Sequence, residues 1–324
     1  MSSFIAAGTS YSSHNQPMLP FYIFYSMFGF QRVGDFIWAA ADSRARGFLI
    51  GATAGRTTLS GEGLQHQDGT SPLIAATIPN CRAYDPCFGY ELAAILQDGA
   101  RRMMEAREDV FYYITVMNEN YAQPALPEPR AETVDGILRG MYLLRPSSRP
   151  PVAAGDSHGN PRVQLLGSGT ILREVLAAAE ILEHEHDVAA DVWSVTSFTE
   201  LARDGMDVER WNRLHPTAPA RESWVERCFK GRDGPAVAAT DYVRAYAEQI
   251  RALVQRPYTV LGTDGMGRSD TRAALRAFFE VDRRHVALAA LKALAEREAI
   301  PASRVADAAA HWHVDPERTA PWRL

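Results

Sequence analysis

A glycine-rich loop between residues 55 and 69 carries side chains whose types and spacing suit acid–base chemistry. The loop contains four glycines together with Glu62, His66 and Asp68. Catalytic groups are often found on loops that rigid strands hold in place. A histidine, whose pKa lies near ~6.5, can accept or donate a proton around neutral pH. The loop is therefore a candidate active-site segment, although its residues alone also suit an ordinary surface loop.

An aromatic segment precedes this loop in the chain. Residues 21–30 include six aromatic side chains, namely Phe21, Tyr22, Phe24, Tyr25, Phe28 and Phe30. Such density is most often found in a hydrophobic core. At a strand end that faces a cleft, the same rings can stack on a heteroaromatic ligand. The residues alone favour a core and leave the ligand site as the alternative.

Other motifs do not indicate a nucleotide or metal site. The sequence Gly167-x-Gly169 lacks the third glycine and the acidic residue of the dinucleotide fingerprint, so it favours a tight turn. His184 and His186 are two residues apart and do not share a helix face, which argues against a metal pair. The three cysteines include no Cys-x-x-Cys pair. We therefore assign no metal ligands.

Length and composition indicate a two-domain globular protein. The chain has 324 residues, of which 46% are hydrophobic and 23% charged, and its formal net charge is -5. The charges are mixed and form no basic stripe, which argues against a nucleic-acid or acidic-membrane partner. No signal peptide or transmembrane segment is recognisable, and the few cysteines fit a reducing compartment. We predict a cytoplasmic protein with neither nucleic acid nor membrane as a partner.

Alternating strands and helices are predicted to position the loop. In the first part of the chain we expect strands at 18–25, 47–52 and 110–116 and helices at 31–44 and 86–107. Residues 122–162 have the proline, glycine and serine content of a linker, with an apolar piece at 134–144. Beyond it we expect strands at 163–169, 191–198, 235–240 and 258–262 and helices at 171–185, 242–254, 270–280 and 283–297. This order predicts an α/β fold with two open, mainly parallel sheets flanked by helices.

The first residues of the chain look helical from the outset. Phe4, Ile5 and Tyr11 are spaced as part of one apolar face. Free termini usually begin with a frayed polar tail. We therefore expect residues upstream of Met1 to be missing.

Several long segments, in the same order, resemble the homodimeric bacterial pyruvate dehydrogenase family of transketolase-like, thiamine-diphosphate-dependent enzymes. These segments are residues 20–32, 55–69, 78–80, 118–121, 195–205 and 261–270. The resemblance covers nearly the whole chain. It implies that residues 1–127 form an N-terminally incomplete pyrimidine-binding (middle) domain and that residues 128–324 form a transketolase-like C-terminal domain.

The resemblance also implies roles for the candidate residues. Phe28 is expected to stack on the pyrimidine half of thiamine diphosphate, and Tyr25 to line the same pocket. His66 is expected to handle protons or hold the substrate, and Glu62 to orient that network. The cofactor would carry the chemistry of pyruvate decarboxylation. The acetyl group would pass to a lipoyl group on the lipoyl domain of dihydrolipoamide acetyltransferase.

Two parts of the family pattern are absent from the sequence. The glutamate that meets the pyrimidine nitrogen precedes the position of Met1, and the Gly-Asp-Gly motif that binds Mg²⁺ and diphosphate is missing. We therefore expect the Mg²⁺ ligands on an N-terminal domain outside this sequence, and an isolated chain without activity. The chain is expected to form a homodimer or to pair with a separate N-terminal half. The alternatives are a non-catalytic dimerisation or assembly module, a truncated product, and a transketolase-like subunit acting on another keto substrate.

Overall fold

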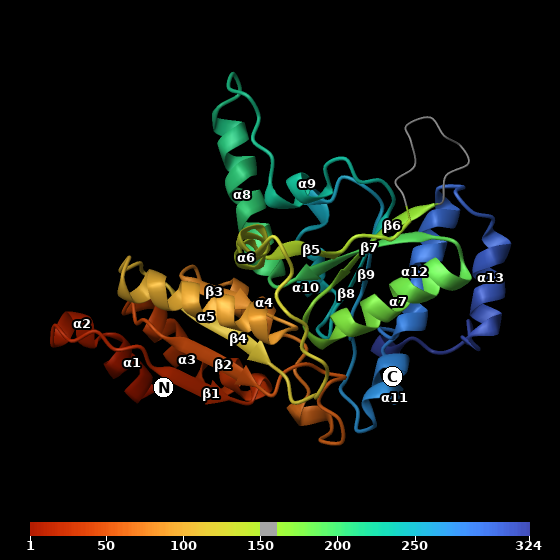
Figure 1. Ribbon diagram of the computed structural model, residues 1–324. Helices are drawn as coiled ribbons and strands as arrows, with labels where there is room; N and C mark the ends of the chain where they lie inside the picture. The colour runs from red at the N-terminus through yellow and green to blue at the C-terminus, as the bar shows by residue number, and fades with distance from the viewer. Residues whose placement is uncertain (150–160) are drawn as a thin grey trace.

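The computed structural model describes residues 1–149 and 161–324. The described chain forms two sheets of mainly parallel strands, each covered by helices on both faces (Figure 1). This arrangement confirms the predicted α/β class with two open sheets. Residues 150–160 of the predicted linker lie outside the described residues.

The first sheet has four parallel strands in the order β1-β2-β4-β3. They are β1 (Phe21–Phe24), β2 (Phe48–Ala52), β3 (Cys81–Tyr84) and β4 (Phe111–Val116). One face is covered by α1 (Ser2–Gly8), α3 (Ser26–Asp42) and α4 (Ser71–Ala76), with the short α2 (Ser10–Ser13) following α1. The other face is covered by α5 (Gly89–Met104) and α6 (Arg130–Arg139). Because helices lie on both faces, β2 and β4 are almost continuously buried and apolar.

The second sheet has five strands in the order β5-β7-β6-β8-β9. They are β5 (Met141–Arg145), β6 (Arg162–Gly167), β7 (Ala189–Val195), β8 (Ala236–Ala239) and β9 (Tyr258–Leu261). Only β5 runs antiparallel to its neighbour among these described strands. One face packs on α7 (Leu172–Glu185), α11 (Arg272–Phe278), α12 (Arg283–Glu296) and α13 (Ala302–His311). The other packs on α8 (Phe198–Leu214), α9 (Trp224–Phe229) and α10 (Ala245–Glu248).

The predicted helix over residues 242–254 is wrong. Only α10 and the short 3-10 helix η3 (Arg251–Leu253) form there. Backbone groups at its start are bound by distant segments: the Val243 N–H donates to the Gly69 carbonyl at 3.0 Å, and the Tyr242 carbonyl accepts from the Thr263 N–H at 2.8 Å. These long-range bonds replace the i to i−4 pattern that the apolar spacing favoured.

Several further elements were not predicted, among them α4, α9, α13, the strand β3 and the helix α8. The strand β3 is only four residues long and includes the polar Arg82, so it gave no clear strand pattern. Helix α8 begins directly after Ser197, whose side chain accepts a hydrogen bond from the Glu200 N–H. The predicted strand at 191–198 therefore ends earlier, at Val195. None of the described helices combines the length and the apolar content needed to cross a membrane.

The two sheets are joined by buried polar contacts. The Asp85 N–H donates to the Thr196 carbonyl at 2.7 Å. Glu91 on α5 accepts hydrogen bonds from the Tyr142 hydroxyl at 2.7 Å and the Ser194 hydroxyl at 2.6 Å, both of which belong to the second sheet. Since unpaired buried polar groups are costly, these bonds specify how the two layers of the molecule fit together.

Asp85 is the least satisfied carboxyl group at this joint. Its Oδ1 accepts from the Thr115 hydroxyl at 2.6 Å and the Tyr242 hydroxyl at 3.3 Å, whereas its buried Oδ2 has no hydrogen-bond partner among the described residues. Burial raises the pKa of Asp85 to about 7, and the negative charge of Asp241 adds to this effect, while the hydroxyl donors oppose it. The carboxyl group thus changes its charge near neutral pH inside the joint.

This titration predicts a pH-dependent stability. The folded-state pKa lies above the unfolded value of ~3.9, so the proton stabilises the folded state. That stability is complete at acid pH and is lost as the pH rises to about 7, with a slope of at most about 1.4 kcal/mol per pH unit. In Asp85→Asn the free energy of unfolding, measured by urea denaturation, should depend less on pH in this window. The exposed Asp135→Asn variant is the control, and identical pH profiles for Asp85→Asn and wild type would contradict the assignment.

Candidate functional site

Three rings from two segments of the first sheet meet at one place. Tyr25 directly follows β1, and Phe28 lies in the first turn of α3. The imidazole of His66 lies edge-on to both rings, with centroid distances of 5.5 Å to Tyr25 and 5.0 Å to Phe28. Tyr25 is 43% exposed and Phe28 is half-buried, so neither ring is sealed in the core. The structure therefore places these aromatic residues at a partly open surface, where their sequence alone favoured a core.

Glu62 lies beside the imidazole. Its Oε2 is 3.9 Å from the Nε2 of His66, which is within ion-pair range but too long for a direct hydrogen bond. The other ring nitrogen, Nδ1, is buried and has no hydrogen-bond partner in the described part of the chain. A histidine in this setting can bind a ligand atom through Nδ1, while the carboxylate lies near enough to Nε2 to orient the ring. All four residues that the sequence singled out thus lie together.

Arg32 also belongs to this group, although sequence reasoning did not single it out. Its guanidinium carbon lies 4.1 Å from the centroid of the Phe28 ring. The sequence could have indicated this contact, because Phe28 and Arg32 are four residues apart and therefore lie on the same face of a helix. A cation over the ring makes this wall positively charged next to the exposed aromatic surface.

Asp68, the third polar residue of the loop, has a structural role instead. It is buried and accepts hydrogen bonds from the Thr70 and Ser71 N–H groups, each at 2.9 Å, and from the Ser71 hydroxyl. These bonds satisfy backbone donors at the start of α4. Asp68 therefore does not join Glu62 and His66 at the ring cluster.

The base of the loop is held by the second sheet. The carboxylate of Asp241, which follows β8, accepts hydrogen bonds from the backbone and hydroxyl groups of Thr57 and Thr58 at 2.6–3.1 Å. The guanidinium of Arg56 donates to the carbonyls of Thr263 and Gly265. Burial lowers the pKa of Arg56, an effect that the negative charge of Asp68, among others, opposes. None of these contacts between distant segments was predicted.

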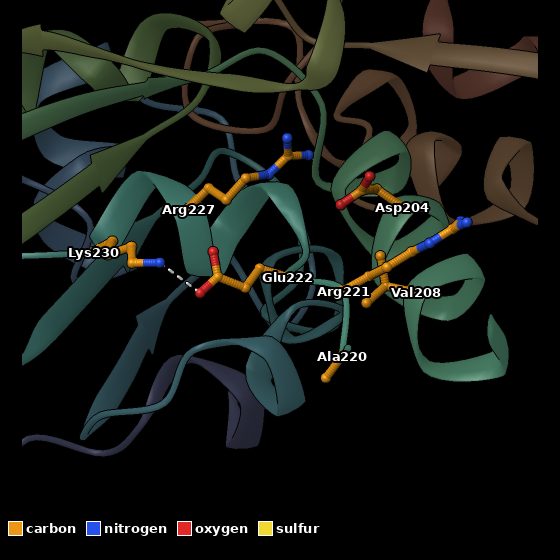
Figure 2. A pocket seen from close by; sticks show the side chains of 7 residues that line it. All are labelled: Asp204, Val208, Ala220, Arg221, Glu222, Arg227 and Lys230. Atoms are coloured by element: carbon orange, nitrogen blue, oxygen red, sulfur yellow. Dashed lines mark hydrogen bonds and ion pairs between the residues drawn. The ribbon is translucent and has the colours of Figure 1, made fainter. Parts of the chain in front are cut away.

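A hollow beside the second sheet lies apart from this group. It is formed by α8, α9 and the segment between them, and Figure 2 shows its lining: Asp204, Val208, Ala220, Arg221, Glu222, Arg227 and Lys230. Lys230 and Glu222 form an ion pair within it at 2.8 Å (Figure 2). The guanidinium carbon of Arg221 lies 3.8 Å from the centroid of the Trp211 ring. Because its charges of both signs are exposed and partly paired, we assign this hollow no ligand.

Metal-binding residues do not cluster in the described ranges. Residues 1–149 and 161–324 contain no group of three or more His, Cys, Asp or Glu side chains that could hold a metal ion. The three cysteines are unpaired thiols, and burial raises the pKa of Cys81 to about 12.

Two family descriptions match the chain. Residues 1–124 match the "Pyruvate dehydrogenase E1 component middle domain", and residues 140–282 match the "Transketolase-like TK C-terminal domain". Solved structures show the same fold at low sequence identity. A transketolase from Leishmania mexicana has a TM-score of 0.60 at 16% identity, and the aligned region covers 86% of this chain and 34% of that one. A structure described as "Split gene transketolase, inactive beta4 tetramer" has a TM-score of 0.58 at 16% identity, covering 90% of this chain and 81% of that one.

Curated relatives are much more similar in sequence. The "Pyruvate dehydrogenase E1 component" of Pseudomonas aeruginosa is 62% identical over 322 residues, which is 99% of this chain and 35% of the relative. The protein of the same name from Escherichia coli is 54% identical over 98% of this chain and 35% of the relative. The chain thus spans about a third of the length of these relatives. The chain is similar to pyruvate dehydrogenase E1 components over almost its whole length and matches the C-terminal part of these relatives.

Proposed function

We propose that the chain is part of a thiamine-diphosphate-dependent enzyme that decarboxylates pyruvate oxidatively and transfers the acetyl group to the lipoyl group of dihydrolipoamide acetyltransferase. The observation that carries the proposal is the convergence of Tyr25, Phe28 and His66 beside Glu62. The high identity to E1 components over almost the whole chain supports the same reaction. Transketolases share the fold at 15–17% identity, which carries no argument for a sugar substrate.

The residues present fit one half of the proposed cofactor. Partly exposed Tyr25 and Phe28 rings suit an aromatic pyrimidine, and the buried, unpartnered Nδ1 of His66 suits a polar ligand atom beside it. Nothing among the described residues fits Mg²⁺ and diphosphate, which call for converging oxygen ligands. We propose that a separate N-terminal half supplies those ligands and the glutamate that contacts the pyrimidine, whether or not the chain also forms a homodimer.

The chain's own residues would then bind and orient the cofactor and the substrate, and move protons. When bound, thiamine diphosphate supplies the carbon nucleophile for the keto group. Phe28 stacks on the pyrimidine, and Tyr25 closes the pocket beside it. His66 holds the substrate carboxylate or moves a proton at its ring nitrogens, and Glu62 orients the imidazole from 3.9 Å.

A non-catalytic assembly module is the second candidate. Phe21 and Ile23 on the edge strand β1 are 54% and 66% exposed. An exposed apolar edge of this kind suits contact with another chain.

We further propose that the domain boundary lies near residue 127, between the two matched ranges, and that the protein acts in the cytoplasm.

A reconstitution assay tests whether the chain needs a partner. Alone, it should release no carbon dioxide from pyruvate and should bind thiamine diphosphate with Mg²⁺ too weakly for calorimetry, because residues 1–149 and 161–324 offer no cluster of ligands for the metal and diphosphate. Mixing it with the N-terminal part of the Pseudomonas aeruginosa relative should restore release. Tight, Mg²⁺-dependent cofactor binding by the chain alone would refute the proposal. A stable but inactive mixture would support the assembly module instead.

His66→Ala should reduce kcat of the reconstituted enzyme by roughly 10²–10⁴-fold, the usual contribution of a positioned acid–base group. The exposed His14→Ala is the matched control and should keep full activity. Steady-state kinetics with pyruvate measures both. Full activity of His66→Ala would show that the imidazole takes no part in the reaction.

Phe28→Ala should weaken cofactor binding through lost stacking of about 1 kcal/mol, or roughly fivefold in apparent affinity. Phe36 lies on the same helix and is 44% exposed, so Phe36→Ala is a control with the same chemical change. Cofactor titration of the reconstituted enzyme gives both affinities. Equal affinities for the two variants would place the pyrimidine elsewhere.

A further inference from the structure

We propose that Gln67 is a positioning residue whose buried amide ties the loop carrying Glu62 and His66 to residues 263–272, so that the second domain determines how His66 is held. The catalytic consequence rests on the proposed function, whereas the structural link does not. Gln67 directly follows His66, which ends the short 3-10 helix η1 (Leu64–His66). A change in the position of Gln67 should therefore also move the backbone of His66, because a single peptide unit joins the two residues.

The amide of Gln67 is almost fully used in hydrogen bonds. Its Nε2 donates to the Leu59 carbonyl at 3.0 Å and to the Arg268 carbonyl at 2.6 Å, and its Oε1 accepts from the Arg268 N–H at 2.8 Å. Both amide protons are thus satisfied, and the residue is only 1% exposed. One side chain therefore joins the two arms of the loop to each other and to the second domain.

The approach of the second domain is close at this point. A Cβ atom on Gly267 would lie 2.7 Å from Gln67 Oε1 and 3.1 Å from Leu64 Cα. Such distances leave no room for a larger residue. Further bonds hold the earlier part of the loop: the Ser269 hydroxyl donates to the Gly61 carbonyl at 3.1 Å, and the Arg272 Nε donates to the Thr58 carbonyl at 2.7 Å.

The imidazole has few restraints of its own. Its Nδ1 has no hydrogen bond to the described residues, and Glu62 is 3.9 Å from Nε2. The neighbouring Gly61 and Gly63 have φ values of +79° and +84°, a backbone region that favours glycine. Without an anchor, this segment has many accessible conformations. The contact at Gln67 therefore decides which of them presents His66 to Tyr25 and Phe28.

Nuclear magnetic resonance of the full chain tests the anchor without cofactor or substrate. The His66 ring protons lie beside two aromatic rings, so their chemical shifts should differ from those of free histidine; a His66→Gln variant identifies the signals. In Gln67→Leu these shifts should move toward free-histidine values, and amides in residues 60–68 should exchange hydrogen roughly tenfold faster. Gln65 is exposed on the same loop, so Gln65→Leu is the matched control and should change neither readout.

A second variant disturbs the same contact from the other domain. Gly267→Ala should displace Gln67 and cause the same movement of the His66 shifts, even if Gln67→Leu fails to fold. Gly34→Ala, where a Cβ meets nothing within 4 Å, is its control. Unchanged His66 signals in a folded Gly267→Ala variant, or equal changes in the Gln65→Leu control, would overturn the proposal.

Kinetics of the reconstituted enzyme adds the functional readout. Gln67→Leu should lower kcat roughly tenfold and leave the KM for the cofactor unchanged, because Tyr25 and Phe28 lie at the start of α3 and not on the loop that Gln67 anchors. A merely structural role would lower the amount of folded enzyme and keep kcat per folded site. If no mixture shows activity, the proposed function fails, and the resonance experiment still decides the role of Gln67.

Discussion

The buried carboxylate of Asp241 is the interaction on which the candidate site depends. Its two oxygens accept four hydrogen bonds from Thr57 and Thr58 at the base of the glycine-rich loop. A carboxylate taken out of water is stable only when donors of this kind surround it. The same bonds pair the loop's backbone N–H groups, which would otherwise be unsatisfied in the interior. The loop and the segment that follows β8 therefore satisfy each other's polar groups.

The contact arises because the carboxyl ends of strands from both sheets face each other. Tyr25 follows β1, the glycine-rich loop follows β2, and Asp85 follows β3. From the second sheet, Asp241 follows β8 and Thr263 closely follows β9. Open α/β sheets commonly present functional groups at this edge. In this protein the first sheet supplies the aromatic wall and the loop, while the second sheet supplies the groups that hold the loop in position.

Helices and strands could be predicted from the sequence where the local pattern of apolar residues agreed with the packing in the folded structure. The strands β2, β4, β6 and β8 are short, buried and mainly apolar, and such runs can be recognised in a sequence. The helix expected at 242–254 did not form, because Tyr242 and Val243 use their backbone groups to bind Thr263 and Gly69. Propensity describes a residue and its neighbours, and a bond to a residue far along the chain overrides it.

The sequence by itself determined which residue types are available for chemistry. Glu62 and His66 stood out because a carboxylate and an imidazole share a glycine-rich loop, and the resemblance to a known family added Tyr25 and Phe28. The resemblance also implied that these four side chains meet, whereas only the tertiary structure decided that Asp68 instead supports α4 and that Gln67 is bound to Arg268. The partners of Gln67 and Thr57 lie 201 and 184 residues away along the chain. Contacts at such separations depend on how two sheets pack, and no local pattern of residues records that packing.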